Sequence, residues 1–240
     1  MKKKKILKYL TFILIVLISI IIGYIFTNNK RQEELLKKEI IKLVEKDLNK
    51  DNYDIKIKTK GEYAKVEKKL KKHYKELSSN IKIINSYLDN QDLINILSID
   101  NIENNAPSFE NSYNLINNVK DELNSSISIV INLSSEETIK EILDEKRIKY
   151  IKDDIKKLSN IKDESQIIVD DLNIFLDKVE VILNLLKNNT NNWYIKDNEL
   201  YFKTNKLVNE YNNLYNDLNN FTKDKFSKYN KITKTTLKTM

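Results

Sequence analysis

Residues 9–27 read YLTFILIVLISIIIGYIFT and contain no charged side chain. A helix of this length extends about 28 Å, at about 1.5 Å per residue, which matches the hydrocarbon thickness of a bilayer. Cleavage as a signal peptide requires small residues just after the apolar run, whereas this run ends in GYIFTNN. We therefore expect residues 9–27 to form an uncleaved transmembrane signal anchor.

The flanking charges indicate how this segment is oriented. Residues 1–8 hold five lysines, and Lys30 and Arg31 follow the apolar run. Positive charge is enriched on the cytoplasmic side of membrane helices. Further lysines at residues 37–46 reduce the excess of positive charge on the N-terminal side, although glutamates accompany them. The sequence thus predicts a single-pass protein of the cell membrane, with a basic cytoplasmic N-terminus at residues 1–8 and an extracytoplasmic main domain.

Composition favours helices over sheets. The chain of 240 residues has two glycines, one proline and no cysteine. Glycine supplies the positive φ angles of tight turns and the close backbone approach to phosphate, so its scarcity argues against nucleotide-binding folds. The lack of cysteine excludes disulfides and thiolate chemistry. The many Asn, Lys and Ile residues are typical of an AT-rich genome and favour a low-GC bacterium.

Apolar residues recur every three or four positions behind the apolar segment, which is typical of amphipathic helices. Residues 28–61 are predicted to form a helical stalk and a short extended linker. Residues 134–137 read SSEE and fit a capping box, and a bend is expected near residues 144–147. The further helices are predicted around residues 63–88, 109–133, 137–158, 168–186 and 204–221.

These features predict a mainly all-α fold, in which a single N-terminal transmembrane helix precedes an antiparallel helical bundle at residues 62–226. One small β-hairpin is expected near residues 193–202, where WYI and LYF flank the polar turn KDNE. Its rings, Trp193, Tyr194, Tyr201 and Phe202, are the candidate partner-binding residues. The alternative is that alternate residues of each strand pack onto the helices, which leaves only the outward half available for binding.

The formal charge of +7 is concentrated at the two ends of the chain. Residues 222–240 hold six lysines and one aspartate, and with residues 1–8 they carry +10, so residues 9–221 carry −3. That distribution argues against nucleic-acid binding, which needs cations on one folded face. Residues 227–240 are predicted to be a disordered basic tail. The tail is either solvated or in contact with an anionic surface through Lys223, Lys225, Lys228 and Lys231.

No residue pattern specifies a reaction. His73 is the only histidine and has lysines beside it, so we expect a surface or stripe-edge side chain rather than a metal ligand. The pairs Asp153–Asp154, Asp170–Asp171 and Glu136–Glu137 are adjacent carboxylates, which point about 100° apart on a helix and are predicted to be solvated. We predict no catalytic, metal or cofactor site.

These observations predict a membrane-anchored, non-catalytic binding or scaffold module of the bacterial cell envelope. The expected partners are an envelope protein, an anionic wall polymer or lipid. One alternative is an extracytoplasmic ligand-sensing domain that works with a separate signalling partner, since only eight residues precede the apolar segment; an envelope hydrolase is a third. The pattern resembles single-pass, bundle-forming envelope proteins of low-GC bacteria, and no motif singles out a family.

Overall fold

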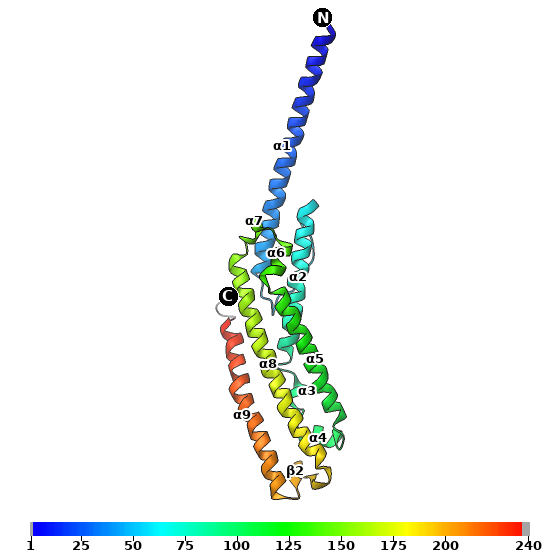
Figure 1. The fold of residues 1–240 in the computed structure, drawn as a ribbon, viewed down its shortest axis with the longest axis vertical. Coiled ribbons are helices and arrows are strands. Elements are labelled where there is room, and N and C mark those ends of the chain that lie inside the picture. The colour runs from blue at the N-terminus through cyan, green and yellow to red at the C-terminus, as the bar shows by residue number, and fades with distance from the viewer. Residues whose placement is uncertain (1, 237–240) are drawn as a thin grey trace. The chain divides into compact units, whose positions relative to one another are not determined.

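The computed structural model describes the backbone of residues 2–236 and the side chains of residues 14–145 and 147–226. The chain is mainly α-helical, as predicted, with one two-stranded antiparallel sheet in its described part (Figure 1). The elements in chain order are α1 (Lys2–Val44), α2 (Gly61–Ser86), α3 (Gln91–Ile94), α4 (Ile99–Asn105), α5 (Glu110–Leu133), α6 (Glu136–Ile142), α7 (Glu145–Ile148), α8 (Lys152–Asn188), a 3-10 turn (Thr190–Asn192), β1 (Trp193–Lys196), β2 (Glu199–Phe202) and α9 (Asn205–Thr236).

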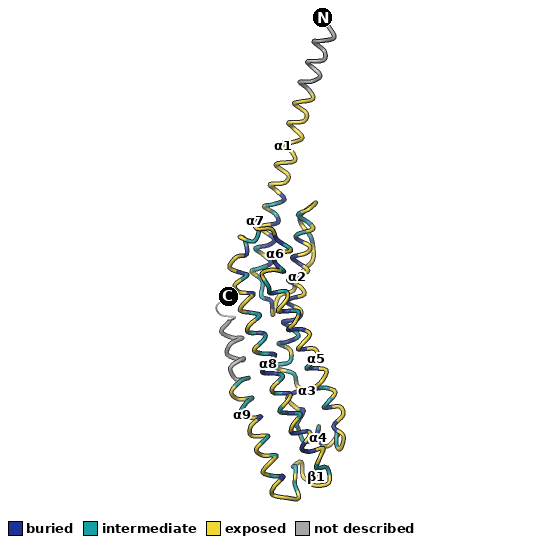
Figure 2. Tube along the Cα trace, viewed as in Figure 1, coloured by how far each residue is buried: buried dark blue, intermediate teal, exposed yellow. Residues whose placement is uncertain are grey.

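The first helix, α1, runs without a break from the apolar segment into the polar sequence behind it. Its described side chains from Leu14 to Arg31 are exposed, as the yellow part of α1 in Figure 2 shows. Within the described residues, α1 is the one helix that is long and apolar enough to cross a membrane.

The polypeptide folds as two compact units. Unit 1 comprises Met1–Ser78 and Ser135–Lys157, and unit 2 comprises Ser79–Ser134 and Leu158–Met240. The bundle predicted for residues 62–226 therefore contributes to both units.

In unit 1 the last turns of α1 pack in the core. Leu36, Ile40 and Leu43 of α1 are buried, as are Leu70 and other apolar side chains of α2. The segment between the two helices adds to this core through Tyr53, whose ring stacks on Tyr74 at 6.2 Å between centroids. The stalk predicted for residues 28–61 is thus part of a folded unit.

In unit 2 three pairs fix the antiparallel register of α5 and α8. Tyr113 donates to Asn184 at 2.7 Å, Lys120 pairs with Asp177 at 2.7 Å, and Asn173 donates to Asn124 at 3.2 Å. Each step forward along α5 is matched by an equal step backward along α8. The antiparallel bundle predicted from the sequence is confirmed here. The opposite side of α8 contacts α9 through the ion pairs Lys178–Asp217 and Lys225–Asp171.

Several helix ends differ from the predicted ones. The expected helix at 137–158 is divided among α6, α7 and the first turns of α8. The helix α8 then continues to Asn188 through the range expected for the next helix, 168–186, because its sequence contains no glycine or proline to end it. The bend near residue 144 is confirmed by the end of α6 at Ile142 and the start of α7 at Glu145. The capping box is wrong in detail, since Ser135 caps α6 and accepts from the Thr138 amide at 3.2 Å.

The C-terminal helix is longer than the sequence indicated. The helix α9 continues to Thr236, so residues 227–236 are helical where a disordered tail was expected. Lysine and threonine are tolerated in helices, and no glycine or proline interrupts this stretch. Residues 237–240 lie outside the described residues.

Candidate functional site

The hairpin formed by β1 and β2 turns through two residues. Asp197 and Asn198 have φ angles of 52° and 60°, and Lys196 pairs directly with Glu199. Two consecutive positive φ angles are typical of the tight turns that match strand twist, and Asp and Asn tolerate this conformation better than most residues. The polar stretch KDNE is therefore not a four-residue loop, since its outer residues belong to the strands.

The side chains of the hairpin alternate between two faces. Trp193, Ile195, Leu200 and Phe202 are half-buried, whereas their neighbours Tyr194, Lys196, Glu199 and Tyr201 are exposed. Such alternation follows from the period of two in a strand.

The inner face is fastened to the helices of unit 2. The Trp193 ring lies 6.3 Å from the Phe109 ring, and its Nε1 donates to the Leu186 carbonyl at 2.8 Å. The Phe202 ring lies 5.2 Å from that of Tyr211 on α9. Phe109 is fully buried although its φ angle is 55°, so the packing of its ring holds a backbone conformation that costs about 1 kcal/mol or more.

The outer face presents a stacked pair of tyrosines. Tyr194 and Tyr201 are opposite each other across the strands, with ring centroids 5.4 Å apart and planes inclined by 11°. They are 47% and 37% exposed. The Tyr201 hydroxyl donates to the Glu199 carboxylate at 2.8 Å, and this hydrogen bond raises the pKa of Tyr201. Two flat rings with hydroxyls, beside Lys196 and Glu199, can stack on and hydrogen-bond a partner.

The four rings nominated from the sequence therefore divide into two pairs. Trp193 and Phe202 face the helices, and Tyr194 and Tyr201 face outward. Only the outward pair is placed to touch a partner without a change in the fold.

Two of the four nominated lysines, Lys223 and Lys225, have described side chains. The Lys225 ammonium lies 3.3 Å from the buried Asp171 carboxylate, so this lysine has a partner inside unit 2. Lys223 is exposed on α9. The side chains of Lys228 and Lys231 lie outside the described residues.

Replacing Trp193 by alanine should lower the free energy of unfolding by about 3–5 kcal/mol, because it removes a large packed ring and the hydrogen bond to Leu186. Replacing Tyr194 by serine should change it by less than about 1 kcal/mol, because that ring is exposed. Urea unfolding measures this free energy for both variants. Far-UV circular dichroism is the signal, because it reports helix content and does not need Trp193 as a probe. Equal losses would show that the outer ring is as much a part of the fold as the inner one.

Unit 1 contains a buried ionic cluster that the sequence pattern does not reveal. The Lys71 ammonium lies 3.0 Å from the Glu39 carboxylate and 2.7 Å from that of Glu67. Lys58 approaches the other Glu39 oxygen at 2.9 Å. Glu67 also accepts from the backbone amides of Lys58 and Thr59, at 3.1 and 2.8 Å. The linker predicted to be extended is thus held by a carboxylate rather than by another strand.

The electrostatics of this cluster favour the charged forms. Burial by itself raises the pKa of Glu39 and of Glu67, but their hydrogen bonds outweigh it, and both carboxyls have a pKa below the ordinary value. Burial likewise lowers the pKa of Lys71, and the two glutamates outweigh it and raise that pKa. All described members have partners, which is the arrangement of an ion cluster that holds chain segments together.

Two expectations about polar residues are corrected. Asp154 and Asp171 are buried, while their neighbours Asp153 and Asp170 are exposed, so only one member of each pair is solvated. Asp154 accepts a hydrogen bond from the Tyr74 hydroxyl, and burial raises the pKa of this carboxyl.

His73 is also buried, with its ring edge against Tyr74 at 5.6 Å, rather than at the surface. Its burial accompanies that of the adjacent Tyr74, because this part of α2 packs inside unit 1.

Among the residues that the structure describes, no group of three or more His, Cys, Asp or Glu side chains is arranged to hold a metal ion. No family model, curated protein or solved structure matches this chain. The hairpin, α1 and the charges described above are therefore the features that bear on function.

Proposed function

We propose that this protein is a membrane-anchored, extracytoplasmic helical module that binds or organises a partner at the bacterial cell envelope, without catalysing a reaction. The exposed tyrosine pair of the hairpin, Tyr194 and Tyr201, is the observation that carries the proposal. Its partner is an envelope protein, an anionic wall polymer or lipid.

The membrane anchor is supported by the course of α1. The exposed apolar stretch continues as one helix into Leu36, Ile40 and Leu43, which are core residues of unit 1. If the anchor is retained, this continuous helix holds unit 1 close to the membrane, because the folded unit begins within about two turns of the bilayer surface. The five lysines of residues 1–8 favour a cytoplasmic N-terminus.

The binding role is supported by the contrast between the two faces of the hairpin. Trp193 and Phe202 fix its position on the helices, while the outward tyrosines are half exposed and have their rings preoriented by stacking. A rigid aromatic pair loses little conformational freedom on binding, which is why tyrosine is common in contact surfaces.

Protease accessibility tests the location. With an epitope tag after Met240, protease added to intact cells should digest the main domain, and opening the membrane should add little further digestion. Protection until the membrane is opened would place the domain in the cytoplasm and refute the envelope role.

Sedimentation with purified cell walls tests the binding role. The full-length chain in nanodiscs of zwitterionic lipid should sediment with walls or with anionic vesicles, and the double variant Tyr194→Ser/Tyr201→Ser should lose about tenfold in affinity. Tyr215→Ser is the matched control, because Tyr215 is a tyrosine of similar exposure, 44%, on α9. Equal binding by all three chains would refute the assignment of the hairpin as the contact site.

A further inference from the structure

A second exposed feature of unit 2 lies on α8 and is separate from the hairpin. Ile167, Ile174 and Val181 are 54%, 43% and 48% exposed and follow each other at intervals of seven residues. Seven residues are close to two helical turns, so the three side chains form one line along the helix. We call these three residues the α8 stripe.

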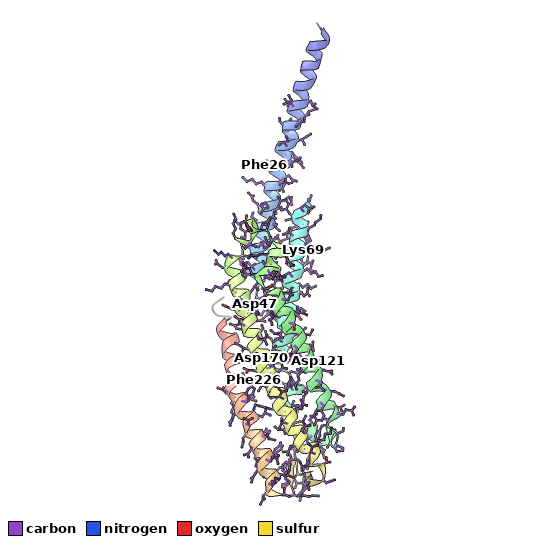
Figure 3. The ribbon with its side chains drawn as sticks, viewed as in Figure 1. Phe26, Asp47, Lys69, Asp121, Asp170 and Phe226 are labelled. Carbon is purple, nitrogen blue, oxygen red and sulfur yellow. The ribbon has the colours of Figure 1, made fainter. Side chains whose placement is uncertain are left out.

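A row of carboxylates repeats with the same period. Asp163, Asp170 and Asp177 each precede a member of the α8 stripe by four residues, so they lie along one flank of it. All three are exposed; Asp170 is labelled on α8 in Figure 3, with Asp121 on α5 and Phe226 on α9. Asp177 remains 66% exposed although it pairs with Lys120.

Among the described side chains, the polar contacts that α5 and α9 make with α8 lie on either side of the stripe. Asn173 and Asp177 contact α5 on one side, whereas Asp171 and Lys178 contact α9 on the other. The apolar surface extends onto α5. Asn124 of α5 lies opposite Asn173 of α8, so seven residues forward along α5 and seven back along α8 place Ile131 opposite Gln166. Ile131 therefore lies beside Ile167. Ile131 is itself 40% exposed.

We propose that the α8 stripe is a docking face for a partner helix that presents apolar side chains at seven-residue spacing beside a row of lysines or arginines. An apolar period of seven is the spacing at which one helix packs along another. The aspartate row selects the charge of the partner, because opposite charges that flank an apolar seam stabilise the correct pairing.

The same row disfavours a second copy of this chain in the antiparallel arrangement. A two-fold axis between two antiparallel copies brings the same flank of each helix together. The three aspartates of one copy would then face those of the other, and like charges at this distance repel. The proposal does not depend on the function of the hairpin, since the two surfaces share no residue.

A defined probe tests this docking face. The full-length chain is placed in nanodiscs of zwitterionic lipid, which does not attract a basic peptide. The probe is a labelled helical peptide of about 21 residues, or three heptads, with apolar residues at the two seam positions and lysine at the flanks. A second peptide carries glutamate at the flanks. Fluorescence anisotropy should show the lysine peptide binding about tenfold more tightly than the glutamate peptide, with the difference shrinking as salt is raised.

Two variants identify the site on the protein. Asp163→Asn/Asp170→Asn/Asp177→Asn should bring the two peptides within about threefold of each other, and Ile174→Asp should weaken the lysine peptide about tenfold. Their matched controls are Glu103→Gln/Asp121→Asn/Glu210→Gln, three exposed acids elsewhere in unit 2, and Ile94→Asp, an exposed isoleucine on α3. Both controls should leave affinity unchanged.

The outcomes separate the occupants. Equal binding of the two peptides, or equal weakening by the control variants, would overturn the proposal. So would a dimer of the full-length chain, seen by mass photometry without peptide, that Ile174→Asp converts to a monomer, because the occupant would then be a second copy.

Discussion

Replacing Lys71 by methionine is expected to lower the free energy of unfolding by about 3–5 kcal/mol, because two buried carboxylates lose their shared cation. Glu39 and Glu67 would remain close to each other, and of these two carboxylates the Lys58 ammonium pairs only with Glu39. Denaturant unfolding of the full-length chain in detergent, followed by circular dichroism, measures this loss.

The pH dependence of the stability follows from the directions in which the pKa values of the cluster are shifted. The pKa values of Glu39 and Glu67 are lowered in the folded protein, so the cluster stabilises the fold fully above the ordinary glutamate pKa of 4.5. This contribution is lost as the pH falls through the lowered values. The difference between wild type and the Lys71→Met variant should therefore shrink in acid.

Lys42→Met is the matched control. Lys42 lies 3.6 Å from the same Glu39 carboxylate, but its side chain is 65% exposed. An exposed pair contributes about 0–1 kcal/mol, so this variant should unfold nearly as wild type does. Similar losses in both variants would show that burial does not govern the strength of the cluster.

Replacing Leu123 by aspartate is expected to abolish the cooperative unfolding transition of unit 2. Leu123 is 0% exposed on α5, and a carboxylate buried in an apolar core costs a large desolvation free energy. The milder Leu123→Ala should cost about 2–5 kcal/mol through the cavity that it leaves. Asn118→Asp, at an exposed position of the same helix, is the control with the same new charge and should retain the transition. A Leu123→Asp chain with unchanged urea unfolding would place this residue outside the core.

The helices were predictable because their apolar periodicity is local. Leu70 and Leu123 belong to stripes that are visible in the sequence, and both are buried. The continuity of α8 could not be predicted, because a polar stretch between two apolar stripes has the same pattern whether the helix continues or ends. Burial of Lys71 could not be predicted, since Glu39 lies 32 residues away and only the fold brings them together.

The hairpin was predictable from the sequence, but which of its two faces points toward the helices was not. Period two shows that Trp193 and Tyr194 point to opposite sides. Contacts with the Leu186 carbonyl and with Phe109 decide which side is inward, and Phe109 is distant in sequence. Similarly, the sequence places Lys225 in a run of lysines, and only the fold brings it beside Asp171.

The uninterrupted course of α1 has a mechanical consequence. Sliding a helix by one residue displaces it about 1.5 Å and rotates it about 100°, which would carry Glu39 away from the Lys71 ammonium at 3.0 Å. If residues 9–27 lie in a bilayer, α1 acts as a rigid rod. Axial or rotary motion of the membrane segment is then transmitted to Glu39 and Lys71. Tension on the membrane segment would then strain unit 1 at the Glu39–Lys71 contact, rather than being absorbed by a flexible tether.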